Sequence, residues 1–274
     1  MIKIRKLHFF KWSFCHISKS GDLMKKTLVL IVAAILMLSL FGCSDKKNAD
    51  VSGVVDAPDK FSTLDEAKVT ENPNIRKESE NVNGMCYAIT LEEFTYNYNE
   101  MLKEAGNLDM INPKGWKMLG SPQNDANGTE YQYYYYNADK INFTASVETK
   151  TNYIMNIGLG TTMSNFVSIE NEKNNSDTIL MKSAVMAAAV SGMGINKVDT
   201  IQDIFYLTTF ENTNELWYNG NVYALSTNED KADSERSTML FRTFPISDEV
   251  KENWGIDEYE SYVANATQIT TNAN

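Results

Sequence analysis

Residues 130–160, EYQYYYYNADKINFTASVETKTNYIMNIGLG, decide the fold of this chain. The stretch contains three runs typical of strands, at 130–136, 141–148 and 152–160, which are rich in aromatic and β-branched residues. Only a few residues separate one run from the next. Such short links suit hairpins, whereas parallel strands need a crossover of about a dozen residues or more. The sequence therefore predicts an antiparallel meander.

The tyrosines of the first run are a candidate binding surface. Because side chains alternate along a strand, we expect one face to pack on helices and the other to be exposed or covered. An exposed row of aromatic rings can stack on sugar rings or contact a protein. The alternative is that tyrosine simply favours half-buried strands. The candidate surface consists of Tyr131, Tyr133, Tyr134, Tyr135 and Tyr136.

Helical patterns lie before and after this meander. Thr90-Leu91-Glu92-Glu93 is a capping box, in which Thr90 and Glu93 satisfy each other's backbone amides. Apolar residues recur at helical spacing from 91 to 105, and Gly106 suits the position after a helix end. The run 179–190 is apolar nearly all round, which predicts a helix buried between layers. Two further helices are predicted over 200–207 and 249–262.

Three more strand patterns complete the prediction. Residues 116–119 and 237–244 are strand-like, and 216–223 form a hairpin in which Asn219-Gly220 suits a type I′ turn. The order is helix, strands, helix, strands, which suggests two helix-plus-meander halves. The predicted fold class is α+β: an antiparallel sheet with two or three helices packed mainly on one face.

The N-terminal part of the sequence contains an export signal. Residues 24–43, MKKTLVLIVAAILMLSLFGC, combine a Lys-Lys start with an apolar run that is short for a membrane span, which needs about 20 apolar residues. Leu40-Phe41-Gly42-Cys43 resembles the lipobox of bacterial prolipoproteins. The resemblance implies cleavage between Gly42 and Cys43, lipidation of Cys43, and a protein anchored in the cell membrane on its extracytoplasmic side. Stable anchoring takes two fatty chains.

These patterns divide the chain into five segments. Residues 1–23 are expected to lie upstream of the true start at Met24, the competing interpretation being an extended basic leader. Residues 24–43 are the signal peptide, and the polar stretch 44–83 is expected to be a flexible tether. A single α+β domain is predicted over 84–262. The Thr- and Asn-rich residues 263–274 are expected to be a disordered tail.

Composition excludes several classes of function for the mature chain. Of 25 basic and 36 acidic residues, the first 43 residues hold seven and one, which leaves 18 and 35 and a net charge of −17. Such a surface repels nucleic acid, so we expect no nucleic-acid partner. Both histidines, His8 and His16, also lie in the removed part. Catalysis and zinc ligation that depend on histidine are therefore excluded. Cys86 is expected to be a buried apolar residue without a disulfide partner.

The expected function is non-catalytic binding at the cell surface, of an envelope protein, a wall glycan or a small ligand. No catalytic residue, metal ligand or cofactor is assigned; the acidic loop 228–235 lacks the spacing and central glycine of an EF-hand. The alternative is a carboxylate-dependent enzyme acting on wall glycans, which needs two carboxyl groups about 5–10 Å apart. Its candidate acids, chosen only by neighbourhood, are Glu130, Glu148 and Asp139.

Overall fold

The computed structural model describes residues 54–56, 75–107, 109–167, 169–170, 173–211, 213–230, 233 and 236–272. The segment 1–23, the signal peptide with Cys43, and most of the predicted tether lie outside these residues. No helix in these ranges is both long and apolar enough to cross a membrane.

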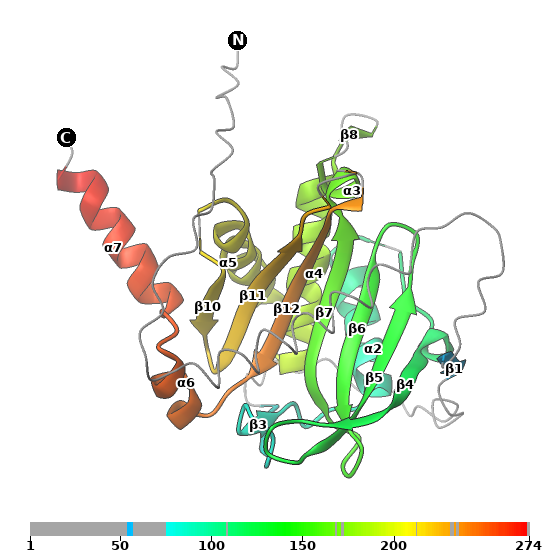
Figure 1. Ribbon diagram of the computed structural model, residues 1–274. Coiled ribbons are helices and arrows are strands. Elements are labelled where there is room, and N and C mark those ends of the chain that lie inside the picture. The colour runs from blue at the N-terminus through cyan, green and yellow to red at the C-terminus, as the bar shows by residue number, and fades with distance from the viewer. Residues whose placement is uncertain are drawn as a thin grey trace.

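An antiparallel sheet forms the centre of the domain (Figure 1). All its neighbouring strands pair antiparallel, which confirms the predicted α+β class. Across the described residues, the sheet has eight strands in the order β1 (Val54–Asp56), β4 (Lys117–Asn124), β5 (Glu130–Asn137), β6 (Asn142–Glu148), β7 (Ile154–Thr162), β12 (Thr238–Pro245), β11 (Asn221–Asn228) and β10 (Glu215–Tyr218). Two short ribbons pair β2 (Lys77–Glu78) with β3 (Met85–Cys86), and β8 (Ile169–Glu170) with β9 (Lys173–Asn174).

The main helices cover one face of this sheet. Figure 1 shows α2 (Leu91–Glu104), α4 (Asn175–Ser191) and α5 (Val198–Phe210) behind the strands, as the sequence predicts. The short α3 (Met163–Val167) follows β7, and 3₁₀ turns lie at Pro113–Gly115 and Ile195–Lys197. After β12, α6 (Asp248–Trp254) and α7 (Tyr259–Asn272) lie beside the β10 edge.

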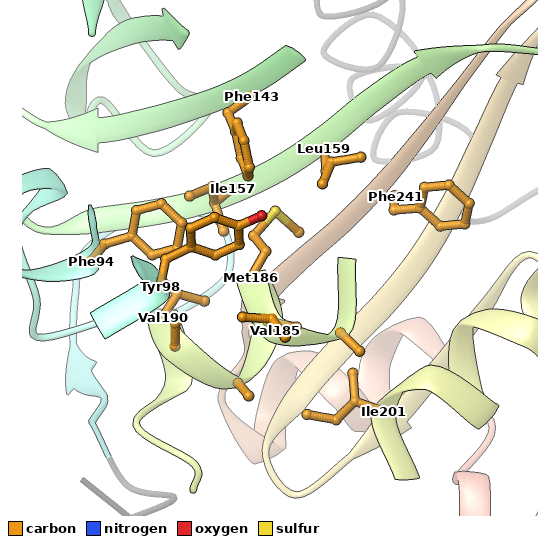
Figure 2. Close-up of a cluster of buried hydrophobic side chains, with 14 of the residues drawn as sticks. Phe94, Tyr98, Phe143, Ile157, Leu159, Val185, Met186, Val190, Ile201 and Phe241 are labelled. Carbon is orange, nitrogen blue, oxygen red and sulfur yellow. The ribbon is translucent and has the colours of Figure 1, made fainter. Parts of the chain in front are cut away.

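The main hydrophobic core lies between the sheet and these helices (Figure 2). Helix α4 is the central element of this layer, and each of its residues 184–190 is at most 1% exposed. This burial on all sides explains why its sequence is apolar nearly all round. Tyr98 of α2 meets Phe143 of β6 edge to face, with ring centroids 5.3 Å apart. The predicted burial of α4 is therefore confirmed, although α4 lies within the helix layer, packed against α2 and α5, and not between two layers.

Local signals in the sequence form the structures that they predict. The Glu93 amide donates to Thr90 Oγ1 over 3.3 Å, and the Thr90 amide donates to Glu93 Oε2 over 2.8 Å, so the capping box that begins α2 is present. Asn219 and Gly220 have φ of 49° and 80° in the β10–β11 turn. Positive φ at both positions is the requirement of a type I′ hairpin.

The two predicted halves meet at the middle of the sheet. The first meander runs from β4 to β7 and the second from β10 to β12. Their last strands pair with each other, so that Gly158 lies opposite Arg242. Each meander thus extends outward from the β7–β12 pair to its own edge, with the helices on the same face. This arrangement places residues from both halves side by side on the sheet surface.

The ends of the domain differ from the predicted boundaries. The 249–262 helix is two helices, because Gly255 adopts φ 63° and ends α6. Helix α7 then continues to Asn272, through most of the predicted disordered tail at 263–274. Within the predicted tether, β1 pairs with the edge of β4, and the buried Asn81 donates to the Met85 carbonyl over 2.8 Å. Short polar segments can form such hydrogen bonds with a sheet edge or a turn. Because these bonds require no periodic apolar residues, the sequence does not predict this order.

Candidate functional site

The face of the sheet turned away from α2, α4 and α5 is called the far face. Because directly opposed residues in a sheet point to the same side, strand register defines its rows. One row runs through Tyr133, Ser146 and Asn156. A second row runs from β7 to β10 through Gly158, Arg242, Ala224 and Glu215.

Tyr131 and Tyr133 lie on the far face and pack together. Their ring centroids are 5.1 Å apart, nearly perpendicular, and their hydroxyl oxygens are 3.3 Å apart. The side chains are only 6% and 4% exposed, in a small cluster with Cys86, Met155 and Leu240. The two rings therefore belong to a packed patch and do not form an exposed aromatic row.

The remaining tyrosines of β5 divide between the two faces, as strand alternation requires. Tyr134 is buried in the main core beneath the helices. Tyr136 also packs against that core, 5.8 Å from the Trp116 ring, and its hydroxyl accepts from the Asn112 amide over 3.0 Å. Tyr135 is half-buried on the far face. The candidate surface of five tyrosines is thus separated, with three on the far face and two on the helix side.

A chain of polar groups crosses the far face beside Tyr133. The Tyr131 hydroxyl donates to Gln123 Oε1 over 3.5 Å, and the Asn156 amide donates to Ser146 Oγ over 3.0 Å. Burial raises the pKa of Tyr133, the hydrogen bond with Tyr131 raises it further, and the charge of Arg242 opposes the rise. The Tyr133 phenol is therefore neutral near pH 7 and interacts through hydrogen bonds, not through charge.

Arg242 is the functional candidate that sequence reasoning missed. Its Nε is buried, and no hydrogen bond or ion pair joins its side chain to another residue that the structure describes. Burial lowers the pKa of the guanidinium, while the nearby Glu215 and Tyr133 raise it. A guanidinium stays charged in proteins and offers five donors. The side chain as a whole is half-buried, and its Nε has no acceptor among the described residues. An anion that reached this group would supply one.

Glu215 lies in the same row as Arg242, on the far side of Ala224. Two inter-strand spacings of about 4.8 Å place their backbones roughly 10 Å apart. Burial raises the pKa of Glu215, and Arg242 lowers it, so the two charges influence each other. No salt bridge between them is found among the described residues. The row therefore carries two opposite charges, separated by the small side chain of Ala224.

The acids proposed for glycan cleavage do not converge. Glu148 is 6% exposed and accepts hydrogen bonds from Ser79 Oγ over 3.1 Å and from Thr151 Oγ1. Glu130 accepts from Thr149 Oγ1 over 2.6 Å. Because Glu148 is opposite Tyr131, alternation directs Glu130 to the other face of the sheet. Asp139 follows the other end of β5, roughly 25 Å from Glu130 at about 3.3 Å per residue.

Cys86 is buried, as the sequence predicts, in the cluster with Tyr131 and Tyr133, and it has no disulfide. Burial, with the charge of Glu148, raises its pKa to about 11. Among the described His, Cys, Asp and Glu residues, no group of three or more is arranged to hold a metal ion. No protein-family model, curated protein or solved structure matches this chain.

Proposed function

We propose that this chain is a lipid-anchored lipoprotein of the extracytoplasmic face of the cell membrane, and that its domain is a non-catalytic binding module. The anchor part of the proposal rests on the sequence from the Lys-Lys start to Leu40-Phe41-Gly42-Cys43. The binding part rests on the far face. The observation that carries it is the partly buried guanidinium of Arg242, whose Nε has no hydrogen-bond acceptor among the residues that the structure describes.

The buried Nε of this arginine lowers the stability of the domain, because it has no acceptor among the described residues. A buried, unsatisfied polar group costs about 1–3 kcal/mol, and more when it is charged. Hydrophobic side chains could fill the same position, because its neighbours along β12 on this face, Leu240 and Phe244, are both buried. A ligand that supplies acceptors would recover this cost on binding. Binding therefore gives a physical reason for the arginine that folding does not.

The arrangement of the acids supports binding over glycan cleavage. Cleavage by paired carboxylates requires two carboxyl groups that face a common cleft. Glu148 is engaged by two hydroxyl donors, and Glu130 and Asp139 lie on another face and at another end of the strand. The far face offers hydroxyl, amide and guanidinium groups instead, which are groups that recognise a ligand without reacting with it.

Two experiments test the proposal. Cells expressing the full chain or Cys43→Ser are labelled with radioactive palmitate and fractionated; the proposal expects label and membrane association only with Cys43. The soluble chain 44–274 is then incubated with wall and envelope preparations, and both the retained material and the supernatant are analysed by mass spectrometry. Retention without released fragments supports a binding module. Released fragments that disappear with Glu148→Gln would overturn it in favour of an enzyme.

A further inference from the structure

We infer that the far face takes up a small zwitterionic ligand, such as an amino acid or a short peptide, with its carboxylate on Arg242 and its ammonium group towards Glu215. The inference rests on the proposed binding function and adds the chemical class of the ligand. It follows from the two charged residues of one cross-strand row, from the small residues beside them and from the charge of the whole protein.

A carboxylate is the group that best satisfies Arg242. The guanidinium presents parallel N–H donors, which pair with both oxygens of a carboxylate or with two oxygens of a phosphate. The chain has a formal net charge of −11, and Glu215 lies in the same row, so a group with two negative charges is repelled. A carboxylate carries one negative charge. The electrostatic surroundings therefore favour it over a phosphate.

Glu215 supplies the second half of the site. Glu215 is exposed, and its carboxylate lies near enough to Arg242 for the two charges to interact without forming an ion pair. A cation beside this carboxylate would favour its charged form. An α-amino acid carries its carboxylate and ammonium on one carbon atom. Such a ligand can interact with both charged side chains of this row.

Small, buried residues lie beside these charges. Gly158 lies opposite Arg242, and Gly160 is the next far-face residue of β7. Ala224 separates Arg242 from Glu215. Tyr133 and Leu240 lie beside these small residues and belong to one apolar cluster. The surface around Arg242 and Glu215 is therefore apolar, which suits a ligand with an apolar side chain.

Three matched probes separate the contribution of each charge. Phenylalanine carries both groups, 3-phenylpropionate carries the carboxylate alone, and phenethylamine carries the ammonium alone. Each is titrated into the ¹⁵N-labelled soluble chain 44–274, and the Nε–Hε signal of Arg242 is followed. The Arg242→Gln and Glu215→Gln variants are measured with the same probes. Arg236→Gln is the control, because Arg236 is exposed and pairs with Asp233 over 3.2 Å.

The expected order of affinity is phenylalanine, then 3-phenylpropionate, then phenethylamine. Arg242→Gln should lower the affinity for phenylalanine and for 3-phenylpropionate roughly 10- to 100-fold, as expected when a hydrogen bond to a charged group is lost. Glu215→Gln should remove the advantage of phenylalanine over 3-phenylpropionate, and Arg236→Gln should change neither affinity. Thermal unfolding of each variant shows whether it is folded.

Two outcomes would overturn the inference. One is that the Arg242 signal does not respond to any probe at 10 mM. The other is that phenethylamine binds as tightly as phenylalanine. Retention of envelope material, despite any of these results, would leave the proposed function standing and remove only the ligand class. If the probes do not bind and envelope material is not retained either, the proposed function is removed as well.

Discussion

Gly158 lies directly opposite Arg242, and its missing side chain makes room for the stem of that arginine. A Cβ at Gly158 would lie 3.1 Å from Arg242 Cγ, 2.9 Å from Leu240 Cδ1 and 3.0 Å from the Phe241 carbonyl oxygen. The carbonyl belongs to a paired strand and cannot move freely. The glycine thus positions Arg242 over β7, where a side chain would displace it.

Gly158→Ala should therefore lower both stability and binding at the far face. Overpacking of this kind costs about 1–3 kcal/mol. Gly160→Ala is the matched control, because its Cβ would meet its nearest neighbours at 3.6–3.7 Å, an ordinary contact distance. Urea unfolding of both variants measures the difference. Equal free energies of unfolding for the two variants would contradict the close packing described at Gly158.

The Tyr87 hydroxyl and Thr243 Oγ1 form a buried hydrogen bond of 3.0 Å, and both residues are fully buried. Thr243→Val keeps the shape of the side chain and leaves the Tyr87 hydroxyl without a partner. The expected loss is about 1–3 kcal/mol in the free energy of unfolding. Tyr87→Phe combined with Thr243→Val should recover much of it, since both polar groups are then gone. A double variant as unstable as the sum of the single ones would show that the bond is absent.

Cys86 should be unreactive in the folded protein. Its thiol is 1% exposed, and its pKa of about 11 leaves little thiolate at pH 8. In the soluble chain 44–274, which lacks Cys15 and Cys43, a thiol-specific disulfide reagent should therefore react slowly at pH 8. The reaction should be fast in denaturant. Rapid labelling of the native protein at that pH would show that the far-face cluster opens readily.

Buried phenols should make the protein unstable in alkali. Burial raises the pKa of Tyr87, Tyr98 and Tyr223 above the usual value for tyrosine. The stabilisation from the neutral phenols is fully present below the unfolded pKa of about 10, and it is lost as the pH rises above that value. Melting temperature should thus fall steeply above about pH 10, with ionisation at 295 nm accompanying unfolding. Ionisation of all tyrosines in a still folded protein would contradict this prediction.

Much of the fold is predictable from local signals in the sequence. The capping box at Thr90 and the turn at Asn219-Gly220 depend on residues within a few positions of each other, and both form as predicted. The alternation along β5 likewise correctly separates the tyrosines between two faces. The continuation of α7 to Asn272 was missed because the Thr- and Asn-rich segment has weak helix propensity.

The candidate site is harder to predict because it depends on pairing between distant strands. Arg242 was noticeable only as a charged residue in an otherwise apolar strand pattern at 238–245. Its importance follows from Gly158, Ala224 and Glu215, which the β7–β12–β11–β10 register places beside it. Burial of Tyr131 and Tyr133 likewise depends on packing with Cys86 and Met155. A single sequence does not contain this register.

The central claim is that the far face is the binding surface, and one measurement tests it most directly. The soluble chain 44–274 and its Arg242→Gln and Arg236→Gln variants are immobilised at equal density, exposed to the same envelope preparation and washed. The retained material is then quantified. The account predicts that Arg242→Gln retains at least tenfold less than the parent, while Arg236→Gln retains the same amount. Equal retention by all three folded proteins would contradict the claim and place the binding surface elsewhere.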